Sequence, residues 1–102
     1  MYQQISADDA KNIMDTKNDI IILDVREQYE YDEGHIPNAI LIPYTEIESK
    51  AESVIPDKNK EILVYCRSGR RSKIAAESLV KLGYTNVKEF GGIIDWPYEI
   101  EE

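Results

Sequence analysis

The sequence predicts an α/β fold with a parallel sheet and helices on both of its faces. Segments with the pattern of strands alternate with helical segments along the chain, which is the order typical of parallel sheets. The predicted strands are almost continuously apolar rather than alternating, as expected when both faces of a sheet are covered. The 102 residues suffice for one domain with a small core, and no repeat or linker divides them. We therefore expect a single domain over residues 1–102.

The first helix and the first long strand have clear boundary signals. Ser6, followed three residues later by Asp9, is typical of a helix N-cap and predicts a helix to about Asp15. A turn at 18–19 leads into a nearly continuous apolar run over 20–25, which we interpret as a buried strand.

The middle of the chain is expected to contain shorter elements. One or two helical turns fit residues 27–32 and end before Gly34. A short buried strand is predicted over 39–42, where Pro43 closes it, and an amphipathic helix over 44–54.

The last third of the chain carries the strongest signals. An apolar strand is predicted over 61–65, followed by a helix over 72–82 with Gly83 as its end signal. A last strand is expected over 87–90, and we interpret the pair Gly91–Gly92 behind it as a tight turn.

The charge of the chain disfavours some classes of partner and leaves one local exception. A net charge of −8 disfavours binding to nucleic acid. Acidic residues gather at 27–33, 46–52 and 99–102, and we interpret them as solvated faces. The segment from Arg67 to Lys73 has four cations and no acid, which favours a small anionic ligand.

The location follows from what the sequence lacks. No apolar run approaches the length of a membrane span, and the first residues lack the basic and apolar regions of a signal peptide. A single cysteine excludes an internal disulfide framework. We expect a cytoplasmic protein with no membrane partner.

Cys66, the only cysteine, lies where its thiolate is favoured. It follows the predicted strand directly and precedes a short loop rich in arginine and glycine, after which a helix begins. The positive end of the helix dipole and the cations Arg67, Arg70 and Arg71 favour a negative sulfur. Gly69 permits a tight turn in which successive backbone N–H groups converge on an anion. The sequence therefore predicts a nucleophilic cysteine within an anion-binding loop.

The length of this loop favours one kind of anion. The segment from Cys66 to Arg71 spans six residues. In cysteine phosphatases the loop is one residue longer, and the position of their arginine falls on Ser72 here. The shorter loop should form a tighter cradle, which suits a terminal persulfide sulfur better than a tetrahedral phosphate.

Four groups of residues, in the same order along nearly the whole chain, resemble the single-domain rhodaneses, a family of sulfurtransferases. They are Leu-Asp-Val-Arg-Glu at 23–27 with Tyr-Glu at 29–30, Gly-His-Ile-Pro-Asn-Ala at 34–39, Val-Tyr-Cys-Arg-Ser-Gly-Arg-Arg-Ser at 64–72, and Gly-Gly-Ile at 91–93 with Trp96. Asn38 stands where many relatives have glycine, but asparagine also tolerates left-handed backbone angles.

The resemblance implies a three-layer fold with a five-stranded parallel sheet and a ping-pong mechanism. The Cys66 thiolate would attack the outer sulfur of a donor such as thiosulfate, carry the sulfur as a persulfide and pass it to cyanide, a thiol or a protein cysteine. Backbone N–H groups from Arg67 through Ser68, Gly69 and Arg70 to Arg71 would bind the anionic sulfur, and Arg67 and Arg71 would attract the donor. No cofactor or metal is implied, and we expect a monomer.

Other candidate residues have a structural interpretation beside a catalytic one. His35, the only histidine, lies in a Gly-His-Ile-Pro turn, and we interpret it as part of the scaffold rather than a base. Asp24 and Arg26 at the end of a strand are expected to form a hydrogen-bonded pair that holds loops together. Ser72, where the helix is predicted to begin, is expected to support the site.

Two competing functions stay open at this point. A cysteine phosphatase or arsenate reductase would use the same type of nucleophile, but the six-residue loop argues against both. A binding module that has lost catalysis would keep the fold, but the intact Cys66 and its cationic loop argue against it.

Overall fold

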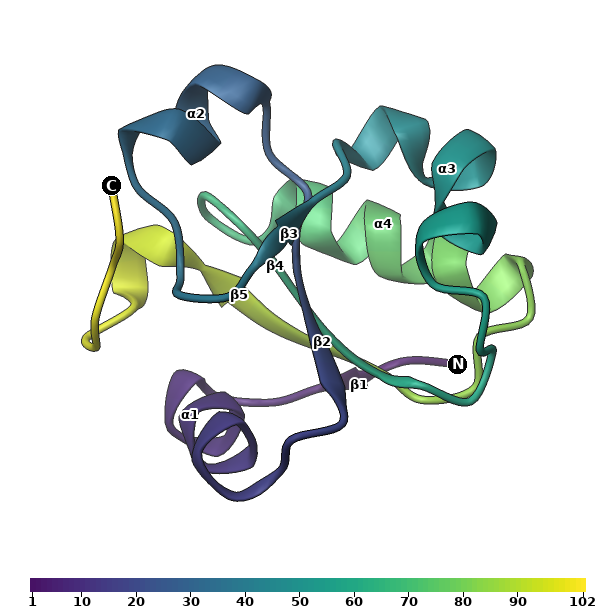
Figure 1. Ribbon diagram of the computed structural model, residues 1–102, viewed down its shortest axis with the longest axis horizontal. Helices are drawn as coiled ribbons and strands as arrows, with labels where there is room; N and C mark the ends of the chain where they lie inside the picture. The colour runs from purple at the N-terminus through teal and green to yellow at the C-terminus, as the bar shows by residue number, and fades with distance from the viewer.

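A five-stranded parallel sheet forms the centre of the computed structural model, which describes residues 1–102 (Figure 1). The strands lie in the order β1-β5-β4-β2-β3, and each neighbouring pair is parallel. Their bounds are Gln3–Gln4 for β1, Ile20–Asp24 for β2, Ile40–Leu41 for β3, Glu61–Cys66 for β4 and Val87–Gly92 for β5. The carboxyl ends of all strands point the same way, toward the side where such folds bind their ligands. The predicted fold class is confirmed.

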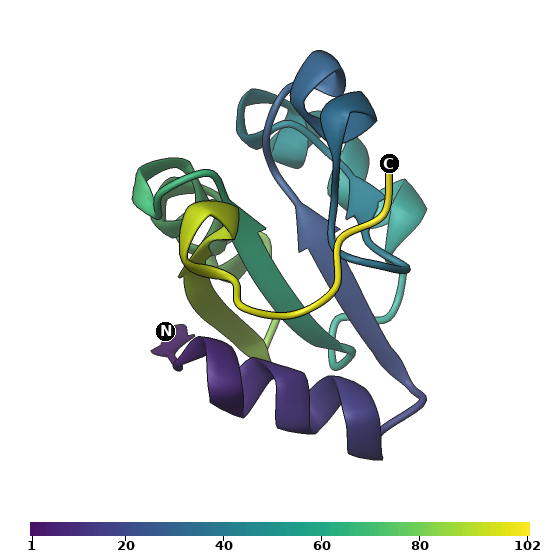
Figure 2. The same ribbon diagram turned by 90° about the vertical axis from the view of Figure 1, so that its left-hand side faces the viewer.

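Helices cover both faces of this sheet. Helix α1 (Ala7–Thr16) lies on one face together with the C-terminal segment, whereas α3 (Ile47–Val54) and α4 (Arg70–Lys81) lie on the other (Figures 1 and 2). A separate buried cluster of apolar side chains forms beneath each layer. No helix combines the length and the apolarity that crossing a membrane requires.

Shorter elements complete the chain beyond the carboxyl ends of the strands. Helix α2 (Gln28–Glu33) follows β2, the 3-10 turn η1 (Tyr44–Glu46) precedes α3, and the 3-10 turn η2 (Ile93–Asp95) follows β5. The Asn38 backbone has a φ of 71°, the only positive φ outside glycine. This is the left-handed conformation that asparagine tolerates.

Strand β4 explains why the sequence shows no alternation here. It lies between β5 and β2, and all six of its residues are buried. Leu63 and Tyr65 belong to the cluster on the α1 face, while Ile62, Val64 and Cys66 belong to the cluster beneath α3 and α4. Since side chains of a strand alternate between its faces, both sets must be apolar. The same alternation directs Cys66 toward α4.

Several predicted elements and boundaries differ from the structure. The predicted helix over 44–54 is divided into η1 and α3, and α4 begins at Arg70, two residues before the predicted start. The interpretation of Gly91–Gly92 as a tight turn was wrong, because both residues continue β5. Strand β1 was missed because it consists of two exposed glutamines.

Candidate active site

Cys66 is held at the carboxyl end of β4, beside Gly92 of β5. Its thiol is free and the residue is only 1% exposed. The backbone N–H of Gly69 donates to Sγ over 3.0 Å, and Sγ lies 3.4 Å from the Ser72 hydroxyl oxygen, to which the thiol can donate. The structure thus surrounds one sulfur atom with a backbone donor and a hydroxyl group.

The turn from Cys66 into α4 depends on Gly69. Gly69 has a φ of 114°, in the left-handed region that favours glycine, and it occupies the N-cap position of α4. The helix that follows is 12 residues long, so its unpaired N–H groups and its dipole favour negative charge at this end. No side chain caps this helix. Instead, the Cys66 sulfur accepts the backbone N–H of the N-cap residue, Gly69.

The loop is pressed against β5 at a place where only glycine fits. An added Cβ atom on Gly92 would lie 2.0 Å from the carbonyl oxygen of Arg67 and 2.5 Å from the Cα atom of Ser68. The Arg67 carbonyl also accepts the backbone N–H of Ile94 over 3.2 Å. Strand β5 therefore supports the loop directly through backbone contact.

The three arginines of the loop have different surroundings. Arg71 donates to both carboxylate oxygens of Glu30 over 2.7 and 2.9 Å, whereas the Arg70 guanidinium lies over the ring of Tyr44, 5.9 Å from its centroid. Arg67 is exposed and makes no ion pair or side-chain hydrogen bond in the structure. The guanidinium most available to an incoming anion is therefore that of Arg67.

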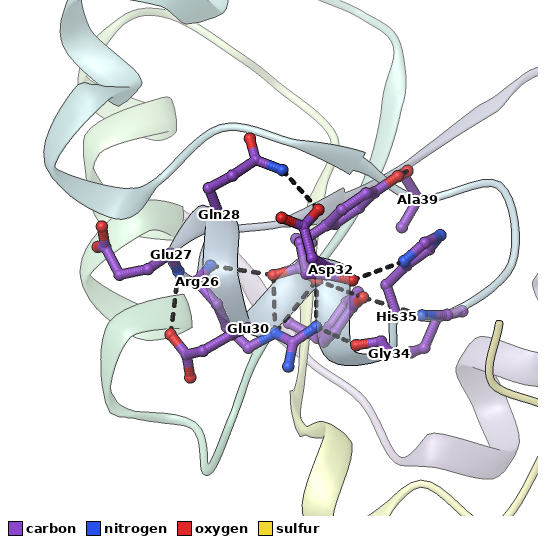
Figure 3. Close-up of polar contacts among 12 residues, drawn as sticks. Arg26, Glu27, Gln28, Glu30, Asp32, Gly34, His35 and Ala39 are labelled. Carbon is purple, nitrogen blue, oxygen red and sulfur yellow. Dashed lines mark hydrogen bonds and ion pairs between the residues drawn. The ribbon is translucent and has the colours of Figure 1, made fainter. Parts of the chain in front are cut away.

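Helix α2 delivers the carboxylate that binds Arg71. Glu30 accepts the backbone N–H of Glu27 over 3.0 Å, which completes a capping box at the start of α2 (Figure 3). Hydrogen bonds from the Arg71 guanidinium lower the pKa of Glu30 from 4.5 to about 2, and the same contact raises the pKa of Arg71. Glu30 is 9% exposed, so its interpretation as part of a solvated acidic face was wrong.

Asp24 and Arg26 form the hydrogen-bonded pair that the sequence predicts. The Arg26 guanidinium donates to Asp24 over 2.7 to 3.1 Å and to the carbonyl of Gly34 over 2.7 Å (Figure 3). Asp24 also accepts the Tyr65 hydroxyl over 2.7 Å, and that hydroxyl accepts the backbone N–H of Ile36. Burial, together with the charge of Asp24, raises the pKa of Tyr65. The network joins the ends of β2 and β4 to the turn at 34–36.

His35 lies within the same scaffold rather than beside the thiol. Its ring stacks on Tyr31 with centroids 3.8 Å apart, and Nδ1 lies 2.9 Å from the Tyr31 carbonyl oxygen (Figure 3). Its backbone exchanges two hydrogen bonds of 2.8 Å with Glu101. These contacts fix the C-terminal segment against the turn after α2.

Glu89 is a site residue that sequence reasoning missed. It is 2% exposed, and its Oε2 accepts the Ser72 hydroxyl over 2.6 Å and the backbone N–H of Gly91 over 2.8 Å. Its position in the last strand could have indicated its burial. Because side chains of a strand alternate, Glu89 lies on the same side of β5 as the buried Val87. An acid on that side must be buried.

A groove of about 560 Å³ lies next to the loop and includes Arg67. Apolar side chains that are partly or largely exposed line it, together with acids of α2 and the C-terminus; among them are Tyr29, Ile94, Ile100, Glu33 and Glu102. No group of three or more His, Cys, Asp or Glu side chains is placed to hold a metal ion.

Comparisons with known proteins agree on one family. The model described as the Rhodanese-like domain matches residues 6–97. The chain is 41% identical over 73 residues to the thiosulfate sulfurtransferase PspE of Escherichia coli, covering 72% of this chain and 70% of PspE. It is 39% identical over 97 residues to the thiosulfate sulfurtransferase GlpE of Coxiella burnetii, covering 94% of this chain and 88% of GlpE.

Solved structures and a longer relative extend this result. The rhodanese-related protein of Thermoplasma volcanium superposes with a TM-score of 0.84 at 34% identity, covering 98% of both chains. YrkF of Bacillus subtilis is 38% identical over 99 residues, but the chain spans only 52% of its length. The likeness thus includes proteins of similar length and a protein in which this fold is one part.

Proposed function

Because the chain belongs to the family of rhodanese-like domains, we propose that it is a sulfurtransferase that carries sulfane sulfur as a persulfide on Cys66. The observation that carries the proposal is the free Cys66 sulfur held at the N-cap of α4, where Gly69 donates a hydrogen bond to it over 3.0 Å. This environment stabilises an anionic sulfur, which is the state that both the nucleophile and the product require.

The first half-reaction loads the enzyme. The Cys66 thiolate attacks the outer sulfur of thiosulfate, an S–S bond forms, and the bond to the sulfonate sulfur breaks with its electron pair. Sulfite leaves as a dianion, and the cysteine becomes an anionic persulfide. The total charge of the thiolate and thiosulfate equals that of the persulfide and sulfite. The loop therefore stabilises the same amount of negative charge before and after the exchange.

The second half-reaction unloads the enzyme. A thiophilic acceptor such as cyanide, a thiol or a protein cysteine attacks the terminal sulfur, and Cys66 leaves as a thiolate. Two separate exchanges with one covalent intermediate give ping-pong kinetics. The thiolate that leaves is the species with which the cycle begins.

The loop residues divide into those that meet sulfur and those that hold them. Backbone N–H groups of residues 67–71 would stabilise the persulfide, and Arg67 would attract the anionic donor. The proposed supporting residues are Asp24, Arg26, His35 and Ser72. Ser72 ties the start of α4 to β5 through Glu89, whereas the other three hold the end of β2 and α2 to the turn at 34–36. Arg71 acts through Glu30 as an anchor between α4 and α2.

The groove beside Arg67 supports an acceptor larger than cyanide. Its apolar and acidic lining would accommodate a segment of another molecule that brings a thiol to Cys66. We propose that the chain acts as a monomer in the cytoplasm, where a free catalytic thiol stays reduced.

Intact mass under non-reducing conditions tests the proposal. Thiosulfate should add the mass of one sulfur atom to the wild type, cyanide should remove it, and Cys66→Ser should gain nothing. If no sulfur is gained from thiosulfate or another sulfane donor, the proposal is overturned in favour of a binding module. Hydrolysis of an aryl phosphate that depends on Cys66 would overturn it in favour of a phosphatase.

A further inference from the structure

A continuous chain of hydrogen bonds connects the Cys66 thiol to a buried carboxylate. The thiol donates to the Ser72 oxygen over 3.4 Å, and the Ser72 hydroxyl donates to Glu89 Oε2 over 2.6 Å. The three side chains come from β4, α4 and β5, and each residue is at most 2% exposed. The chain is therefore closed to solvent along its length.

We propose that Glu89 is a positioning residue that takes the Cys66 proton through Ser72, so that Cys66 and Glu89 share one proton. The proposal deepens the function given above and rests on it for its role in turnover. The S–H bond breaks and leaves its electron pair on sulfur while an O–H bond forms at Ser72. The original Ser72 proton passes to Glu89 Oε2, which becomes a neutral carboxyl group. The Ser72 hydroxyl then points at the thiolate as a donor.

The groups around Cys66 and around Glu89 determine which of the two side chains carries the negative charge. At Cys66 the charge meets the Gly69 N–H, the N-terminus of α4 and the field of Arg71, whose pKa the Cys66 charge helps to raise. Opposite charges so arranged stabilise the thiolate.

At Glu89 no cation is present. Its partners are the Ser72 hydroxyl, the Gly91 N–H and the Gln4 amide at 3.3 Å, all neutral, and it forms no ion pair. Tyr2 is close enough for Glu89 to act on it: burial raises the pKa of Tyr2, and the charges of Glu77 and Glu89 raise it further. The Glu89 carboxylate thus has hydrogen-bond donors but no cation, whereas the sulfur has both, and this difference is our reason for placing the negative charge on sulfur.

The shared proton also serves the anionic chemistry of the site. A dianionic donor approaches an enzyme whose buried site carries one negative charge, on sulfur, instead of two. Coupled groups of this kind titrate as a pair rather than separately.

Glu89→Gln tests the proposal without changing the shape of the site. The amide oxygen can accept from Ser72 and Gly91 as Oε2 does, and its NH₂ group can donate to Gln4 once the Gln4 amide turns its oxygen toward it, but the side chain cannot take a proton. Because Cys66 is the only cysteine, thiolate absorbance is read as the difference between each variant and the same variant carrying Cys66→Ser. This subtraction also removes the absorbance of the tyrosines.

We expect Glu89→Gln to shift thiolate formation upward by about one pH unit, which is a tenfold lower thiolate fraction near neutral pH. Ser72→Ala should shift it by a similar amount, and the double variant should show no further shift, since either change breaks the same chain. An unchanged or downward shift in Glu89→Gln overturns the proposal, because removal of a charged carboxylate would ease thiolate formation.

Infrared spectroscopy of the unmodified side chains provides a second readout. At neutral pH the wild type should show a protonated carboxyl band that both Glu89→Gln and Cys66→Ser lack. Absence of this band in the wild type, or its persistence in Cys66→Ser, overturns the proposal even if Glu89→Gln does not fold. Neither the thiolate absorbance nor the infrared band requires a sulfur donor. A failure of the shared-proton proposal can therefore be distinguished from a failure of the proposed sulfur transfer.

Discussion

Replacing Gly92 with alanine should move the loop that carries Cys66. The added Cβ atom would lie 2.0 Å from the Arg67 carbonyl oxygen, while contacts of this kind are essentially never shorter than 3.0 Å. The obstacle is backbone, not a flexible side chain, so the loop must retreat by about 1 Å. Gly92 has a φ of −128°, which alanine adopts freely, so the effect is purely steric.

A displacement of this size should reduce sulfur transfer far more than stability. Misplacing reacting groups by about 1 Å costs on the order of 100-fold in rate, and we expect that loss in kcat/KM for thiosulfate and cyanide. The assay is steady-state thiocyanate formation, and a thermal unfolding curve of each variant shows whether the fold persists.

Gly83→Ala is the matched control. Gly83 follows the far end of α4 and has a φ of 100°, so alanine would be strained there by about 1–2 kcal/mol, but the nearest atom to the added Cβ is Lys58 Nζ at 3.7 Å. It should lower the unfolding temperature and leave sulfur transfer close to that of the wild type. The reasoning is refuted if Gly92→Ala turns over thiosulfate like the wild type, or if both variants lose activity equally.

Three further predictions follow from the contacts of the site. Arg67→Ala should raise KM for thiosulfate with little change in kcat, because an exposed guanidinium attracts the donor without touching the reacting bond; steady-state kinetics with the reverse pattern would place Arg67 in the transition state. Glu30 has a lowered pKa, so the stability that it contributes is present above pH 4.5 and is lost as the pH falls toward about 2. Urea unfolding should therefore show Glu30→Gln less stable than the wild type by up to about 3 kcal/mol at neutral pH and equal to it near pH 2, and a constant difference would contradict the assignment. Tyr65→Phe should destabilise the protein by about 1–3 kcal/mol, since Asp24 and the Ile36 N–H lose a buried partner; an unchanged unfolding midpoint would show that the network contributes nothing.

The sequence predicts those elements whose residues carry a local signal. The apolar runs of β2 and β4 and the Ser6 cap of α1 are such signals, and Ser6 indeed accepts the Asp9 N–H over 3.0 Å. Strand β1 has none, because its two glutamines are recruited by pairing with β5 at the edge of the sheet. Its existence depends on a partner 85 residues away in the chain, as the contact between Gln4 and Glu89 illustrates.

The sequence indicated the cysteine around which the candidate site is built, but not the partners of the charged residues near it. Cys66 stands out because a strand, a glycine loop and a helix follow one another within a few residues. The partners of the loop come from elsewhere: Glu30 is 41 residues from Arg71, and Glu89 is 17 residues from Ser72. For Glu30 the sequence gives no signal, since its burial arises only when α2 packs beside α4; for Glu89 the period of β5 indicates burial but not the partner.

The distribution of charge around the loop bears on how the proposed sulfurtransferase would serve two chemically different partners. Glu30 neutralises Arg71, so the positive charge open to an anionic donor lies on Arg67 and on Arg70, which is also exposed and forms no ion pair. The groove that includes Arg67 is also lined by Arg26, by acids and by apolar side chains, so it presents charges of both signs beside the loop. In the proposed function, Arg67 would attract the anionic donor, and the same groove would later admit a thiol acceptor to Cys66. A ping-pong cycle permits such a shared approach, because the product of the first half-reaction leaves before the acceptor binds.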